Sequence, residues 1–292
     1  MKLTLGPILF NWEPDAWRDF YFRVADEAAV DAVAVGEVVC SKRMPFFEDH
    51  FSAVLERLAA AGKEVLVSSL ALVTLERERR QTEELARDGE WLMEANDISC
   101  IAHLAGRPHV VGPFVNVYNE GTAQWFAAQG ARRICLPPEL PLESVAAIAA
   151  ATPQVEVEVF AFGRAPLAIS ARCYHARLHK LAKDNCRFVC VTDPDGLPVD
   201  TLDDERFLVV NGVQTLAYAC TNLTADLGDL ARAGVASLRL SPQHCDMVAV
   251  IDTFRAVLDG RMFPEQGLRQ LAAIYPNVPA TNNFLRARAT AV

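Results

Sequence analysis

The stretch AVAVGEVVC, residues 32–40, contains the clearest evidence for the type of fold. Apart from Glu37, residues 32–39 are apolar and rich in valine, as expected of a strand that is buried on both faces of a parallel sheet. The stretch ends at Cys40, and Pro45 then precedes a helix expected over residues 47–61. The pattern therefore predicts a strand followed by a helix, with Cys40 at the C-terminal end of the strand.

The same alternation continues on both sides of this unit. We expect strands over residues 3–9, 32–39, 64–72, 98–102, 109–119, 132–136, 155–163 and 235–242. We expect helices after Pro14 and over residues 47–61, 74–95, 124–129, 142–151 and 247–258. Eight strands, most of them separated by helices, predict an α/β fold: a (β/α)8 TIM-like barrel or a distorted relative of one. An open doubly wound sheet is the alternative, but no G-x-G-x-x-G follows the first strand.

The longest interruption of the pattern follows the seventh strand. Residues 164–222 are expected to form an insertion that contains three cysteines and a hairpin around residues 207–219. Single barrels of about 250 residues are common, so we expect residues 1–292 to form a single barrel domain.

Composition and charge exclude several classes of function. The chain has 292 residues, 51% of them hydrophobic and 22% charged, which is typical of a compact globular protein. Its net charge of -9 argues against nucleic acid as the main partner, because phosphate recognition depends on clustered Lys and Arg. No apolar run approaches the roughly 20 residues of a membrane span, and residues 1–7 are too short for a signal peptide, so a cytoplasmic location is expected.

Four of the eight cysteines are expected at one end of the barrel. Cys173, Cys186 and Cys190 lie in the insertion, and Cys40 follows the second strand. The C-terminal ends of barrel strands form the rim where active sites are built, so these four thiols could meet there. Four thiolates can hold a [4Fe-4S] cluster or a zinc ion; the lack of two short cysteine pairs favours iron-sulfur. A radical-SAM motif is excluded, because Asp193 occupies the position where its third cysteine is required.

The other cysteines and the nearby histidines are given structural roles. His175 and His179 are spaced i, i+4 and could ligate zinc on a helix, but a surface position in this Lys- and Arg-rich segment is the favoured interpretation. The remaining cysteines lie in apolar contexts and are expected to be small buried hydrophobes: Cys100, Cys135, Cys220 and, with less support from its context, Cys245.

Candidate catalytic residues come from the ends and interior of the strands. Glu156 and Glu158 alternate with valines, and one of them is a candidate to face the site from inside the barrel, the alternative being a solvated strand face. Glu37 precedes Cys40 by three residues and has the same two interpretations. Three polar residues near the end of the fifth strand could orient a ligand or simply form a turn: Asn116, Tyr118 and Asn119. There is no H-E-x-x-H, G-x-S-x-G or P-loop motif, so nothing indicates a hydrolase.

Several of these segments together resemble a known family. They are GEVVCSKR (36–43), EVEVFAFGRAPLAISARC (156–173), Cys186-x3-Cys190 and FLVVNGVQT (207–215). Their order and spacing resemble the collagenase-like peptidase superfamily, and within it the UbiV branch, which is required for oxygen-independent ubiquinone biosynthesis in bacteria. Of the superfamily signature E-x-F-x-x-G, Glu158, Phe160 and Gly163 match. Its first following cysteine is replaced at about Pro166 and its second matches Cys173, a loss that speaks against peptidase activity.

The resemblance implies a function that the residues alone do not give. It implies a [4Fe-4S] cluster bound by Cys40, Cys173, Cys186 and Cys190, and a heterodimer with a homologous UbiU-like subunit. Such pairs are implicated in hydroxylating the ubiquinone precursor ring without molecular oxygen, with prephenate as a plausible oxygen donor. The alternatives are a non-catalytic, metal-stabilised binding subunit, an RNA-hydroxylation factor and a peptidase.

Overall fold

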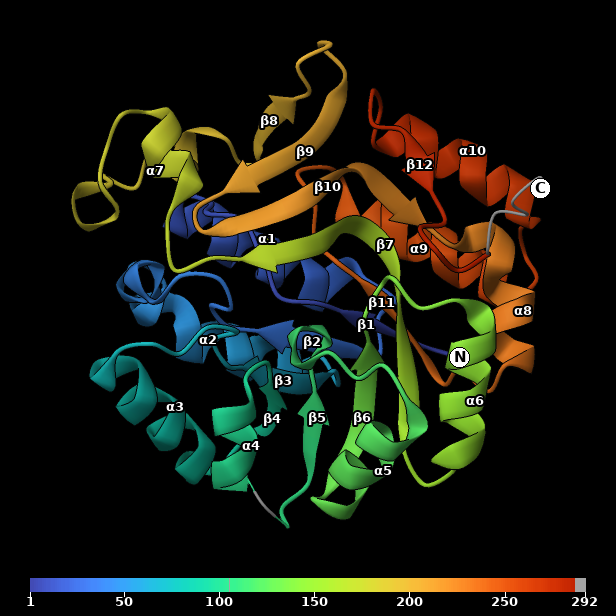
Figure 1. Cartoon of the computed structure of the whole chain (residues 1–292). Helices are drawn as coiled ribbons and strands as arrows, with labels where there is room; N and C mark the ends of the chain where they lie inside the picture. Colours follow the sequence, from blue (N-terminus) through green and yellow to red (C-terminus); the bar gives the residue numbers. More distant parts are fainter. Residues whose placement is uncertain (105, 287–292) are drawn as a thin grey trace.

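Eight parallel strands form a closed barrel in the computed structural model, which describes residues 1–104 and 106–286 (Figure 1). The barrel strands are β1 (Lys2–Leu5), β2 (Ala32–Val35), β3 (Glu64–Ser68), β4 (Leu92–Ala95), β5 (His109–Val111), β6 (Ala131–Leu136), β7 (Glu156–Ile169) and β11 (Ser237–Leu240). They pair in that order, and β11 closes the ring by pairing with both β7 and β1. The expected TIM-like barrel is confirmed.

Helices cover the outside of the barrel. They are α1 (Pro14–Glu27), α2 (Glu48–Ala60), α3 (Glu76–Asp88), α4 (Ile98–Leu104), α5 (Glu120–Ala128), α6 (Leu142–Ala151), α8 (Leu227–Arg232), α9 (Met247–Leu258) and α10 (Pro264–Ile274). On α1, for example, Trp17, Tyr21 and Val24 form the buried apolar face. None of the helices in residues 1–104 and 106–286 combines the length and the apolar content that a membrane span needs.

The fourth strand was predicted in the wrong place. Residues 98–102 form part of α4, which buries Cys100, Ile101 and Leu104 on one face, a helical spacing. The strand is β4, in the segment that was expected to end a helix over residues 74–95. The expected strand over 109–119 is also too long, because β5 ends at Val111 and the 3-10 helix η2 (Pro113–Val115) follows it.

The seventh strand continues past the barrel and starts the insertion. Up to Phe162, β7 pairs in parallel with β11; from Phe162 to Ile169 it pairs antiparallel with β10 (Gln214–Asn222). The expected hairpin is formed by β9 (Arg206–Asn211) and β10, with β8 (Leu197–Asp200) at its edge and the short β12 (Ala280–Thr281) beside β10. The change of partner occurs around Gly163 (φ +115), where a Cβ would lie 2.8 Å from Ser241 Cβ. The glycine of the E-x-F-x-x-G pattern is therefore needed for this bend.

The insertion lies over the C-terminal end of the barrel. Figure 1 shows α7 (Tyr174–Leu178), β8 and β9 on the side to which the arrowheads of β5 and β6 point. Three short 3-10 helices complete the rim: η1 (Ser41–Phe46) after β2, and η3 (Lys183–Asn185) and η4 (Val189–Thr192) after α7. Of the remaining described elements, η5 (Thr224–Asp226) leads into α8.

Charged residues occupy the centre of the barrel. Arg239 on β11 donates from Nε to Glu158 Oε1 on β7 at 2.7 Å and from Nη2 to Glu94 on β4. All three side chains are buried, and the Ser68 hydroxyl and the Asn96 amide also donate to Glu94, at 3.0 and 3.2 Å. Burial alone would raise the pKa of Glu158, but the guanidinium groups of Arg239 and Arg133 lower it below its ordinary value. One guanidinium therefore bridges both buried carboxylates.

Removing that cation tests how much the barrel depends on it. Arg239→Leu removes the guanidinium that pairs with both buried carboxylates, and should lower the free energy of unfolding by about 3–5 kcal/mol, measured by urea denaturation. Arg232→Ala is the control, because it breaks only an exposed pair with Asp229 and should change stability by less than about 1 kcal/mol. Equal effects of the two substitutions would contradict a structural role for the interior pair.

Candidate metal centre

The four cysteines expected at the rim line a single cavity. Cys40 precedes η1, Cys173 precedes α7, Cys186 follows η3, and Cys190 lies in η4. Cys173 and Cys190 are buried, and Cys40 and Cys186 are partly buried. All eight cysteines of the chain are free thiols. Two segments that are more than 130 positions apart in the sequence therefore bring four thiols together.

Glu37 fixes the position of Cys40. Its Oε1 atom accepts the backbone N–H groups of Val39 and Cys40 at 2.7 and 2.8 Å. The carboxyl is buried, and desolvation raises its pKa although Arg43 and the two N–H groups oppose the rise. Glu37, a catalytic candidate from the sequence, is thus placed to hold the cysteine loop.

Arg43 is a site residue that the sequence analysis missed. It is 1% exposed, donates from Nη1 to the Leu9 carbonyl at 3.2 Å, and from Nη2 to Asn211 Oδ1 at 2.7 Å. Asn211 in turn donates to the Cys190 carbonyl at 2.9 Å. One guanidinium therefore ties the loop after β1, the loop after β2 and the insertion together beside the cysteines.

Hydrogen-bond donors point at the sulfur atoms. The Asn11 amide lies 3.3 Å from Cys190 Sγ, the Ala176 N–H lies 3.4 Å from Cys173 Sγ, and Lys42 Nζ lies 3.8 Å from Cys186 Sγ. Three cationic side chains line the cavity: Lys42, Arg43 and Lys183. The described lining residues include no carboxylate. Such donors stabilise thiolates, which are the form of cysteine that binds metals.

Two of the four thiols are nevertheless hard to ionise on their own. Burial raises the pKa of Cys40 and of Cys173 above the usual cysteine value, more than the nearby Arg43 lowers it. At neutral pH these side chains are protonated unless a bound metal ion displaces the proton. The donor set, soft sulfur from four residues with cations around it, fits a thiolate-bound metal centre.

His175 was predicted at the surface, and the structure corrects this. Its side chain is fully buried, on α7, because the ring packs under the hairpin and Nδ1 lies 3.2 Å from the Val210 carbonyl. Only His179 is exposed as expected. The two rings stack with centroids 5.3 Å apart, and Asp193 Oδ2 lies 3.1 Å from His175 Nε2.

The remaining candidates lie away from the cysteines. Glu156 is at the start of β7, the opposite end of the barrel, where it pairs with Lys2 and Arg133. Glu158 is in the interior ion pair described above. Asn116 adopts a left-handed turn conformation after η2 (φ 62), and Asn119 caps α5 by accepting the Thr122 N–H at 2.9 Å. Tyr118 donates to Glu139. For the two asparagines the turn interpretation therefore accounts for their conformations.

The other cysteines are separate from the cavity. Cys100, Cys135 and Cys220 are buried, as predicted, and Cys245 is only partly buried. Cys135 lies inside the barrel, beside Glu158 and Arg239.

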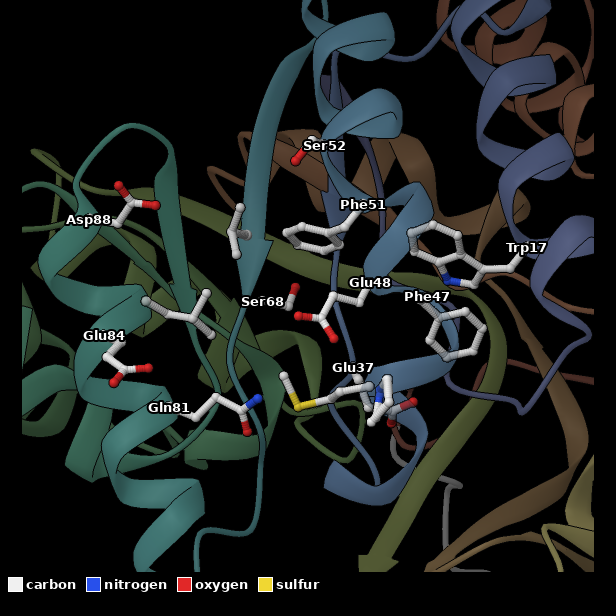
Figure 2. Close-up of a pocket in the computed structure, with 15 residues that line it drawn as sticks. Trp17, Glu37, Phe47, Glu48, Phe51, Ser52, Ser68, Gln81, Glu84 and Asp88 are labelled. Atoms are coloured by element: carbon white, nitrogen blue, oxygen red, sulfur yellow. The ribbon is translucent and has the colours of Figure 1, made fainter.

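A second, larger cavity lies between α2 and α3, with a volume of about 560 Å³. Figure 2 shows Trp17, Phe47 and Phe51 on one side of it and Gln81, Glu84 and Asp88 of α3 on the other. It is lined by four carboxylates, Glu37, Glu48, Glu84 and Asp88, and by no Lys or Arg among its described residues. We call it the acidic cleft. Glu37 both lines this cleft and binds the backbone of Cys40.

Comparison with known proteins places the chain in a family. The sequence profile of "Peptidase family U32" matches residues 21–290. The chain belongs to peptidase family U32. This agrees with the resemblance to the collagenase-like peptidase superfamily, and it does not distinguish the UbiV branch from other members.

One curated relative of this U32 protein is the 23S rRNA 5-hydroxycytidine C2501 synthase of Escherichia coli (strain K12), 31% identical over 143 residues. The alignment covers 47% of this chain and 21% of the relative, so it spans about a fifth of the relative's length. Among solved structures, dihydropteroate synthase from Thermus thermophilus matches at 16% identity with a TM-score of 0.45, covering 89% of this chain and 94% of that one. Phospho-2-dehydro-3-deoxyheptonate aldolase from Thermotoga maritima matches at 9% identity with a TM-score of 0.39, covering 96% and 72%.

The packing of Arg43 can be tested at Gly212. This glycine has φ +68, and a Cβ there would overlap Arg43 Nη2. Gly62 has a similar φ of +76 with nothing within 4 Å of its Cβ position, so Gly62→Ala measures the backbone strain alone, about 1–2 kcal/mol. Gly212→Ala should cost about 1–3 kcal/mol more, by chemical denaturation, because the guanidinium must move. Equal costs would mean that the Arg43 position is not constrained.

Proposed function

We propose that the chain is a [4Fe-4S]-binding subunit of an oxygen-independent hydroxylase that acts on the ubiquinone precursor ring, together with a homologous UbiU-like subunit. The observation that carries the proposal is the cavity lined by Cys40, Cys173, Cys186 and Cys190 at the C-terminal end of the barrel. The resemblance of these segments to the UbiV branch supports the substrate and the partner, with prephenate as the candidate oxygen donor. Membership of the U32 family supports the coarser assignment.

The spacing of the sulfur atoms favours a cluster over zinc. A tetrahedral zinc site with Zn–S bonds of about 2.3 Å needs its sulfurs about 3.8 Å apart. Within the part of the chain that the structure describes, no three of these cysteines have their sulfur atoms all within 4.8 Å of one another. An iron-sulfur cluster suits a wider arrangement, because each thiolate binds a separate iron atom.

Each part of the site has a defined role in this proposal. When bound, the cluster would supply one-electron transfer. The four cysteines hold it and Glu37 fixes the Cys40 loop. Arg43 and Lys42 offset the negative charge of the thiolates, and Asn11 donates a hydrogen bond to Cys190. The acidic cleft, with its aromatic wall, has the volume and the apolar surface that an aromatic ring requires.

RNA hydroxylation is the second candidate, because the curated relative carries that activity in its name. The net charge of -9 and the carboxylates of the acidic cleft oppose it, since an RNA backbone would be repelled there. A metal-stabilised binding subunit without turnover is the third candidate. Replacement of the first signature cysteine near Pro166 argues against a peptidase.

Metal analysis tests the proposed cofactor. The protein purified under anoxia, with a co-expressed partner, should be brown and contain about four irons and four sulfides per chain. Substituting any one of Cys40, Cys173, Cys186 and Cys190 by Ser should lower the iron content, while Cys245→Ala serves as the partly buried control and should not. A folded, colourless protein without iron, or one containing zinc, would refute the cluster.

A deletion strain tests the substrate. It should fail to make ubiquinone under anoxia and make it normally in air, measured by mass spectrometry of quinones. Wild-type chain and Cys245→Ala should restore synthesis, and Cys190→Ser should not. Normal anoxic quinone levels together with a lost hydroxycytidine in the rRNA would instead establish the second candidate.

A further inference from the structure

Three side chains beside the cysteine cavity converge on one point. They are His175 on α7, His179 immediately after it, and Asp193 after η4. A ligand atom of each lies within 4.8 Å of a ligand atom of the other two. The parallel imidazole rings and the short 3.1 Å contact between His175 Nε2 and Asp193 Oδ2 fix the arrangement.

The tautomer of His175 follows from its partners. The Val210 carbonyl, 3.2 Å from Nδ1, can only accept a hydrogen bond, so Nδ1 carries the ring proton. In a neutral ring Nε2 then presents a lone pair, and it faces a carboxylate oxygen that also only accepts. Nε2 is buried and makes no hydrogen bond. Two acceptors in contact require either a proton or a metal ion between them.

Hydrogen bonds with neighbouring groups orient His175 and Asp193, as is common for side chains that bind metal ions. Metal-binding histidines commonly donate their other ring N–H to a backbone carbonyl, which is the role of Val210 here. The Thr192 hydroxyl lies 3.1 Å from Asp193 Oδ2, and Asn211 donates to the Asp193 carbonyl at 2.8 Å. The carboxylate is therefore held in place by its own neighbours.

We propose that His175, His179 and Asp193 form a second metal site, which binds a divalent transition-metal ion, Zn²⁺ or Fe²⁺. Two imidazoles and one carboxylate are a donor set that both ions accept, and three protein ligands leave positions open for water or a small molecule. The site is separate in chemistry from the cysteine centre, because its nitrogen and oxygen donors differ from thiolates. It goes beyond the proposed function and holds whether or not the chain takes part in ring hydroxylation.

A protonated His175 paired with Asp193 is the competing explanation. This ion pair explains the contact between His175 Nε2 and Asp193 Oδ2, but it does not explain why the His179 ring lies close to both side chains. A metal ion accounts for all three side chains at once, so the two explanations differ in the effect of changing His179.

Metal titration distinguishes them. The cluster-loaded protein, purified under anoxia and treated with EDTA, is titrated with Zn²⁺ and separately with Fe²⁺ by calorimetry. We expect one equivalent to bind, with at least about tenfold weaker binding in His179→Gln and in Asp193→Asn. His179 is exposed, so its substitution should leave the fold intact, and the iron content of each variant is measured to show that the cluster is retained.

Matched controls come from the same chain. His103→Gln on α4 and Asp184→Asn on η3 change exposed residues of the same types and should bind the ion as the wild type does. If either ion binds, and its binding is weakened by the substitutions at His179 and Asp193, the site is supported. The ion that binds more tightly identifies its metal. Binding of neither ion, or equal binding by wild type and both site variants, would overturn the proposal in favour of the ion pair.

Discussion

The buried guanidinium of Arg43 is the contact on which the cysteine cavity depends. It bridges the Leu9 carbonyl after β1 and Asn211 of the hairpin, and it lies 3.9 Å from the Glu37 carboxylate. A buried guanidinium needs hydrogen-bond acceptors and a compensating negative charge, so these partners must arrive together. The insertion and the loop after β2 therefore pack as one unit, and this brings Cys40 to the other three cysteines.

A buried arginine also joins separate segments at the centre of the barrel. Glu94 and Glu158 lie on strands that do not pair with each other, and Arg239 on a third strand joins them. The glutamate of the family pattern is thus part of the scaffold, and Gly163 of the same pattern bends β7 out of the ring. Both residues place the insertion, because the strand that carries Glu158 continues directly into the segment that carries Cys173.

Sequence patterns predicted the strands whose burial is evident from neighbouring residues. They missed the strand and the site residues whose burial depends on partners far away in the sequence. Residues 32–35 are buried on both faces and consist of alanine and valine, so that strand was evident. The strand LMEA was missed because its residues favour helices and Glu94 is charged, yet it is buried against Arg239. Arg43 could not be recognised within CSKR, because its partners lie 34 and 168 positions away. His175 was placed at the surface for the same reason: the Val210 carbonyl that binds it comes from the hairpin.

The charged residues around each of the two cavities indicate which charge of ligand it can bind. In a chain with net charge -9, Lys42, Arg43 and Lys183 gather around the four cysteines, with no carboxylate among the described lining residues. Burial keeps the thiols of Cys40 and Cys173 neutral. Cations grouped around neutral groups repel one another, and an anionic centre among them removes that cost. Four thiolates around a metal cluster are such a centre, whereas the carboxylates of the acidic cleft favour a neutral or cationic ligand. The two cavities adjoin at Glu37, whose carboxylate lines the cleft while holding the backbone of Cys40, so the position of one cluster ligand depends on a side chain of the cleft.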